Sequence, residues 1–132
     1  MAVILVVDDD HDLLDVYESV LQSMGHEPVT KLTIDSGPET VHDVGANALV
    51  VDLQTADEDA YGLRIIEELR SHPQTTNFPI ILCSGASEAI YTLRPKLDAW
   101  GVPVVVKPFS IDELEEQLRA ALEAVGDDEP AA

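Results

Sequence analysis

Five short strand-like segments, four of them apolar runs, recur along this 132-residue chain, and each is followed by a stretch with helical composition. Continuous apolar runs of this length are typical of strands buried on both faces of a parallel sheet. Their alternation with helices predicts an α/β fold, because each helix carries the chain back so that the next strand runs in the same direction. The predicted strands are residues 3–7, 28–32, 48–52, 79–84 and 102–106.

The predicted helices are residues 12–24, 36–45, 62–71, 87–100 and 110–125. Residues three and four apart make one apolar stripe on the first of them: Leu13, Val16, Tyr17, Val20, Leu21 and Met24. In the last helix, Ser110 and Glu113 form a capping box, and the predicted buried face is Ile111, Leu114, Leu118, Ala121, Leu122 and Val125. Pro95 lies inside the fourth helix, where it is expected to break or kink it.

Five such units predict a doubly wound, five-stranded parallel sheet, a flavodoxin-like (βα)5 fold with strand order 2-1-3-4-5. We expect one domain over residues 1–125 and a polar C-terminal tail over 126–132. No apolar run is long enough to span a bilayer, and the N-terminus has no basic segment of a signal peptide. The single cysteine, Cys83, is expected in the core and fits a reducing cytoplasm.

The charge balance is strongly acidic, with 26 acidic against 7 basic residues and a formal net charge of −19. The long-range field of such a chain repels nucleic acid and anionic membrane surfaces, so neither is an expected partner. A cation or a basic protein surface is the more plausible partner.

Four of the predicted strands end in polar residues. Asp8 and Asp9 follow the first strand, Asp52 ends the third, Ser84 ends the fourth, and Lys107 follows the fifth. In an open α/β sheet, ligands bind beyond the carboxyl ends of the strands, at the point where the strand order reverses. We therefore expect these five side chains to lie together at one edge of the sheet.

Carboxylates crowded in this way repel one another unless a cation compensates them, and magnesium prefers such oxygen ligands. A cation, a lysine and a hydroxyl are together what stabilises a phosphoryl group during transfer, and a carboxylate can accept that group as an acyl phosphate. Asp52 is the most central candidate for the acceptor. Each residue alone has an ordinary structural explanation, and Asp10 and Asp12 are read as helix N-terminal charges, so the pattern is specific only as a set.

These motifs resemble the receiver domain of two-component response regulators up to about residue 125. The matching segments are 4–10 (ILVVDDD), the acceptor strand at 50–52, the hydroxyl-bearing strand at 80–85 and the lysine motif at 105–109 (VVKPF). The resemblance implies that Asp52 accepts a phosphoryl group from a histidine kinase or a histidine phosphotransfer protein. It further implies that Ser84 hydrogen-bonds to this group and that Lys107 pairs with it.

For magnesium, the resemblance implies direct ligation by Asp9 and Asp52, contact through water from Asp8, and a contribution from the Gln54 backbone carbonyl. It also implies a cis peptide bond between Lys107 and Pro108. The expected protein is a cytoplasmic switch and no enzyme in the ordinary sense, although it would catalyse its own phosphorylation and dephosphorylation.

Three departures concern the readout of the switch. The loop after Asp52 has neither the methionine nor the proline that is usual there, and its glycine, Gly62, comes about two residues late. The usual aromatic residue three positions before the lysine is Val104, a role for which Tyr91 or Trp100 is a possible substitute. Pro95 disturbs the fourth helix, part of the signalling face common in that family.

The leading hypothesis is a single-domain response regulator that signals by docking to a downstream protein target. A phosphorylation-independent interaction module with the same fold is the main alternative. A phosphohydrolase of the haloacid dehalogenase type would need a second aspartate at position 54, where this chain has Gln54. A dinucleotide-binding domain would need a glycine-rich turn after the first strand, and none is present.

Overall fold

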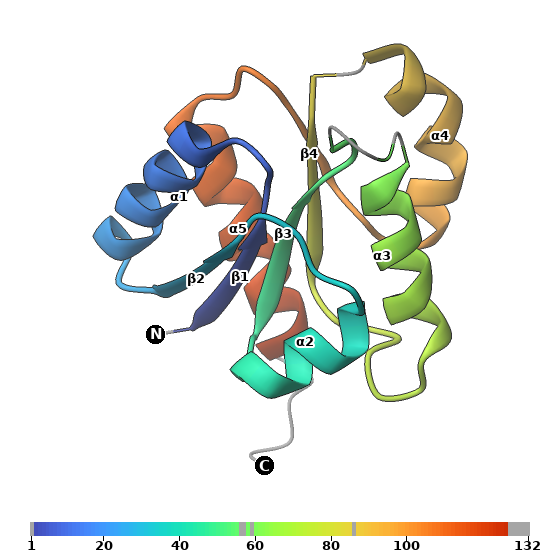
Figure 1. Cartoon of the computed structure of the whole chain (residues 1–132), viewed down its shortest axis with the longest axis horizontal. Coiled ribbons are helices and arrows are strands. Elements are labelled where there is room, and N and C mark those ends of the chain that lie inside the picture. Colours follow the sequence, from blue (N-terminus) through green and yellow to red (C-terminus); the bar gives the residue numbers. More distant parts are fainter. Residues whose placement is uncertain (1, 56–57, 59, 86, 127–132) are drawn as a thin grey trace.

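The computed structural model describes residues 2–55, 58, 60–85 and 87–126. Five parallel strands form one sheet in the order β2-β1-β3-β4-β5, which confirms the predicted fold and strand order (Figure 1). The strands are β1 (Val3–Val7), β2 (Glu27–Lys31), β3 (Ala48–Asp52), β4 (Ile80–Ser84) and β5 (Val104–Val106). The helices are α1 (His11–Ser23), α2 (Gly37–Val44), α3 (Tyr61–Ser71), α4 (Ser87–Ala99) and α5 (Ile111–Gly126).

Helices cover both faces of the sheet, so the core has two halves (Figure 1). Successive side chains of a strand point to opposite faces. In β1, Ile4 and Val6 pack with residues of α1 and α5, whereas Leu5 and Val7 pack with residues of α2, α3 and α4. This is why the central strands are apolar up to the polar residues at their carboxyl ends. Pro28 is tolerated because β2 lies at an edge of the sheet.

The buried face of α1 differs from the predicted stripe. Leu14 is buried beside Tyr17, Val20 and Leu21, whereas Val16 is 45% exposed and Leu13 is only partly buried. Two adjacent leucines fit the helical spacing almost equally well, and packing against the sheet selects the second.

The predicted buried face of α5 is also wrong at one position. Ile111 is exposed, while Leu114 and Leu118 are fully buried. The Ser110 hydroxyl accepts a hydrogen bond from the Glu113 N–H at 3.1 Å, as expected of the cap. Of the tail predicted at 126–132, Gly126 is the last residue of α5, and residues 127–132, like the side chain of Val125, lie outside the described residues.

Pro95 does not break α4, which runs unbroken from Ser87 to Ala99. A proline inside a helix removes one backbone hydrogen bond, to the carbonyl four residues earlier. Here both Pro95 and Tyr91 are exposed, so water can serve that carbonyl. The fifth strand is shorter than predicted, because it begins at Val104 rather than at Val102.

Among the described residues, no helix is long and apolar enough to cross a membrane.

Candidate functional site

The carboxyl ends of β1, β3, β4 and β5 bring Asp8, Asp52, Ser84 and Lys107 to the same edge of the sheet. The ladder fixes their relative heights, since Val7 pairs with Val51 and Asp52 pairs with Cys83. Asp8 and Ser84 are buried, Asp52 is partly buried and Asp9 is exposed. The carboxyl ends of the strands therefore carry a polar site above the apolar core, and Asp9 and Asp52 are its solvent-accessible residues.

Asp8, Asp9 and Asp52 form a carboxylate cluster. One oxygen from each lies within 4.8 Å of the other two. Three hard oxygen ligands at this spacing suit a magnesium ion that keeps several of its waters. Sequence reasoning placed these three residues together, and the geometry agrees.

Asp10 does not belong to this cluster. Its Oδ1 accepts hydrogen bonds from the N–H groups of Asp12 at 3.0 Å and Leu13 at 3.2 Å, so it caps the N-terminus of α1. The Asp10 N–H in turn donates to Oδ1 of Asp8 at 3.0 Å. The cap thus helps to hold the buried Asp8 carboxylate in place.

Lys107 reaches into the cluster from the end of β5. Its Nζ lies 2.8 Å from Oδ2 of Asp8 and 3.3 Å from Oδ2 of Asp52. Burial lowers the pKa of Lys107, but the hydrogen bond to Asp8 and the attraction of both carboxylates outweigh burial, and the net effect is a raised pKa. The lysine is therefore a fixed positive charge at neutral pH. The peptide bond from Lys107 to Pro108 is cis, as predicted.

The environment of Asp52 disfavours its charged form. Burial raises its pKa, and the Asp8 charge raises it further, while Lys107 and a hydrogen bond from the Gln54 backbone act in the opposite direction. The net effect is a raised pKa. One lysine does not fully compensate this group of carboxylates, so the site favours a further cation.

Ser84 ends β4 as a buried residue, and its backbone carbonyl accepts a hydrogen bond from the Lys107 N–H at 2.9 Å. Cys83, one residue earlier, is fully buried, and burial raises the pKa of its thiol to about 12. The burial confirms that Cys83 is a core residue.

Gly62, at the start of α3, packs directly against the backbone of β3. Its N–H donates to the Leu53 carbonyl at 2.9 Å. A Cβ at this position would lie 2.9 Å from Cα of Leu53 and still closer to the carbonyl oxygen of Asp52. The glycine is required because a larger residue would displace the end of β3.

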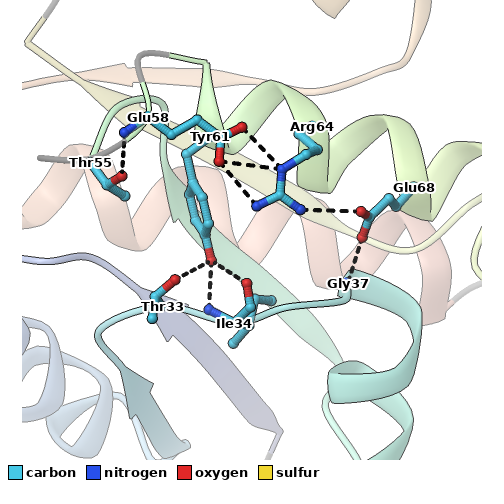
Figure 2. Close-up of polar contacts among 8 residues, drawn as sticks. All are labelled: Thr33, Ile34, Gly37, Thr55, Glu58, Tyr61, Arg64 and Glu68. Carbon is cyan, nitrogen blue, oxygen red and sulfur yellow. Dashed lines mark hydrogen bonds and ion pairs between the residues drawn. The ribbon is translucent and has the colours of Figure 1, made fainter.

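Tyr61 ties α3 to the loop between β2 and α2 (Figure 2). Its buried hydroxyl accepts from the Ile34 N–H at 2.6 Å and donates to the Ile34 carbonyl at 3.0 Å. Beside it, Arg64 forms an ion pair with Glu58, a residue of the loop that follows Asp52. Sequence reasoning missed these three residues, and the only available signal was the unusual composition of that loop.

Val104 occupies the position where an aromatic side chain was expected, and it is partly buried. Trp100 follows the C-terminus of α4, and its carbonyl accepts a hydrogen bond from Arg70, the basic residue in the last turn of α3. The C-termini of α3 and α4 lie at the amino ends of the strands, on the side opposite the carboxylates. Trp100 is therefore on the wrong side of the sheet to replace the usual aromatic residue beside Lys107. Tyr91 is highly exposed on α4 and lines a groove with Val106.

Comparison with known proteins gives a consistent result. The family model described as the response regulator receiver domain matches residues 4–119. The chain is 30% identical over 125 residues to the transcriptional regulatory protein KdpE of Staphylococcus aureus, covering 88% of this chain and 48% of that protein. It is also 30% identical over 123 residues to the probable transcriptional regulatory protein TcrX of Mycobacterium tuberculosis, covering 93% and 50%. The chain thus spans about half the length of the curated relatives it matches.

Solved structures share the fold. A crystal structure of NtrX from Brucella abortus superposes with a TM-score of 0.77 at 27% identity, covering 93% of this chain and 27% of that one. The chemotaxis response regulator CheY4 of Vibrio cholerae gives a TM-score of 0.73 at 22% identity, covering 92% and 99%.

Proposed function

The chain belongs to the family of response regulator receiver domains, and on that premise we propose that it is a phosphorylatable switch whose acceptor is Asp52. One observation carries the proposal: the oxygens of Asp8, Asp9 and Asp52 converge within 4.8 Å while Lys107 contacts two of these carboxylates. The donor would be a histidine kinase or a histidine phosphotransfer protein.

In the proposed reaction, a carboxylate oxygen of Asp52 attacks phosphorus as the bond from phosphorus to the donor nitrogen breaks. Because Asp52 is partly exposed, a donor can approach it from solvent. Lys107 is placed to move its ammonium from the carboxylates toward the oxygens of the arriving phosphoryl group. Ser84 would hydrogen-bond to that group once it is attached.

Magnesium would be held by Asp9 and Asp52 directly, by Asp8 through water and by the backbone carbonyl of Gln54. When bound, it would neutralise negative charge on the transferred group and on the three carboxylates. The donor set supports this assignment, since it consists of hard oxygens that lack full compensation by Lys107.

We further propose a cytoplasmic regulator that signals by docking to a protein target. The net charge of −19 disfavours direct contact with nucleic acid or an anionic membrane. The names of the relatives describe transcriptional regulators, so a partner that itself binds DNA is compatible with the proposal.

The second candidate is a receiver-like module that binds its partner without phosphorylation. Val104 favours it, because the usual aromatic readout has no counterpart at that position. The complete set of Asp8, Asp9, Asp52 and Lys107 argues against it, since a pure binding module has no use for strained carboxylates.

The deciding experiment is intact mass after incubation with acetyl phosphate and magnesium, beside an Asp52→Asn variant. The expected result is a magnesium-dependent gain of one phosphoryl group in the parent alone. Absence of that gain, together with absence of magnesium binding by titration, would favour the phosphorylation-independent module.

A further inference from the structure

The loop that follows Asp52 is closed on itself by two hydrogen bonds between Thr55 and Glu58. The Thr55 N–H donates to the Glu58 carbonyl at 3.0 Å, and the Glu58 N–H donates to the Thr55 hydroxyl at 3.2 Å (Figure 2). Thr55 is only one residue beyond Gln54. A contact that fixes the position of Glu58 therefore also restricts Thr55 and, through it, the backbone of Gln54.

Arg64 holds Glu58 from the first turns of α3. Its Nε lies 3.0 Å from Oε2 of Glu58 and its Nη2 lies 3.1 Å from Oε1, which is a two-point pairing of planar groups (Figure 2). The hydrogen bond to Glu58 is the main cause of the raised pKa of Arg64. Two parallel hydrogen bonds fix the orientation of the Glu58 carboxylate relative to the Arg64 guanidinium as well as the distance between them.

Arg64 is itself fixed by neighbours on other sides. Its guanidinium lies 5.3 Å from the centroid of the Tyr61 ring, and its Nη1 lies 3.3 Å from Oε2 of Glu68. Glu68 also accepts a hydrogen bond from the Gly37 N–H at the start of α2, at 2.9 Å. Tyr61 and Glu68 are both hydrogen-bonded to the β2–α2 segment. Their contacts with Arg64 therefore restrict the position of its guanidinium beside the loop (Figure 2).

At its other end the loop meets the acceptor. The Leu53 carbonyl accepts a hydrogen bond from the Gly62 N–H, and the Gln54 backbone lies close enough to the Asp52 carboxylate to lower its pKa. The segment 53–55 is thus attached to α3 on one side and to Asp52 on the other. Displacement of Glu58 would shift the Gln54 backbone relative to Asp52.

We infer that Arg64 is a positioning residue: through Glu58 it holds the loop in the conformation in which Asp52 and the Gln54 carbonyl receive magnesium. The inference rests on the proposed function, since it concerns the affinity of the same site. It assigns to Arg64 and Glu58 a role that neither composition nor motif suggested.

The net charge of the protein allows one variant to distinguish a positioning role of Arg64 from a simple charge effect. Replacement of Arg64 by glutamine removes a positive charge from an already acidic protein, so a field effect alone would tighten magnesium binding. Loss of the positioning contact would weaken it. The two explanations predict opposite signs for the same variant.

The experiment is isothermal titration of magnesium into the full chain and four variants: Arg64→Gln, Arg64→Lys, Glu58→Gln and the charge-matched control Arg119→Gln. Arg119 pairs only loosely with Glu123, at 3.9 Å on the exposed side of α5. We expect the dissociation constant to rise about fivefold in Arg64→Gln and less in Arg64→Lys. Binding should be unchanged or slightly tighter in Arg119→Gln.

A second measurement needs no metal. Amide hydrogen exchange at Thr55 should accelerate in Arg64→Gln and in Glu58→Gln, and the double variant should be no faster than either single variant. Equal exchange in all variants, or magnesium binding by Arg64→Gln as tight as by Arg119→Gln, would overturn the inference while leaving the proposed function intact. A parent protein that binds no magnesium and accepts no phosphoryl group would refute the proposed function, and the inference with it.

Discussion

The ammonium of Lys107 lies closer to Asp8, at 2.8 Å, than to Asp52, at 3.3 Å. Asp8 is also the more deeply buried of the two, with a side chain only 2% exposed against 13% for Asp52. In the metal-free protein, Lys107 is therefore first of all the counter-ion of Asp8. Asp52 interacts more weakly with the Lys107 ammonium, which fits its proposed role as the phosphoryl acceptor.

Lys107→Met should destabilise the metal-free protein by about 3 kcal/mol, because it leaves the buried Asp8 carboxylate without its counter-ion. Urea denaturation at neutral pH measures this change, and added magnesium should restore part of the loss. Lys96→Met is the matched control, since the Lys96–Glu67 pair is half exposed and worth at most about 1 kcal/mol. Equal effects of the two substitutions would contradict the assignment of Lys107 as a buried counter-ion.

Asp52→Asn should stabilise the metal-free protein at neutral pH. Burial raises the pKa of Asp52 above its ordinary value of 3.8, so the folded state binds this proton more tightly than the unfolded state. Stability consequently falls as the pH rises from 3.8 through the raised pKa, and an asparagine removes that penalty. Thermal unfolding in a chelator across this pH range should show the advantage of the variant shrinking as the pH falls. An advantage that does not change with pH would point to another cause.

Gly62→Ala should destabilise the protein by about 1–3 kcal/mol and slow phosphorylation by acetyl phosphate. The added Cβ meets backbone atoms of Asp52 and Leu53, which cannot yield as a flexible side chain would. Gly85→Ala is a suitable control for stability, because its Cβ would meet only Cβ of Lys107, at 3.9 Å. Denaturant unfolding of both variants tests the difference, and a neutral Gly62→Ala would refute the proposed close packing.

Tyr61→Phe should cost about 1–3 kcal/mol of stability, since it leaves the buried N–H and carbonyl of Ile34 without their hydroxyl partner. Tyr91→Phe removes a hydroxyl from a highly exposed side chain and should change stability by less than about 0.5 kcal/mol. Urea denaturation of the two variants makes the comparison. If the two losses are equal, the Tyr61 hydroxyl does not anchor the β2–α2 segment.

The strands and their polar ends could be predicted because both follow from local pattern. An apolar run that stops at Asp52 identifies a strand and its polar end together, and the alternation with helices fixes the edge at which Asp8 and Lys107 also lie. The face of α1 could not be settled in this way. Leu13 and Leu14 are adjacent in sequence, and only the sheet decides which of them is buried.

The contacts around the loop after Asp52 were beyond sequence reasoning for another reason. Tyr61 meets Ile34 across 27 positions, and Glu68 meets Gly37 across 31. Such pairs depend on how α2 and α3 pack together, and the spacing of apolar residues in either helix does not predict this packing. Pro95 was misjudged because a proline in an exposed turn costs one hydrogen bond that water can replace.

The ion pair between Asp8 and Lys107 joins residues 99 positions apart. Asp8 is therefore synthesised long before Lys107, and a chain that ends anywhere between them has the Asp8 carboxylate without its lysine. Only a molecule whose fifth strand has docked beside the fourth presents all the charges together. The complete set of charges is thus a property of the fully folded chain and of no partly folded intermediate that lacks the fifth strand.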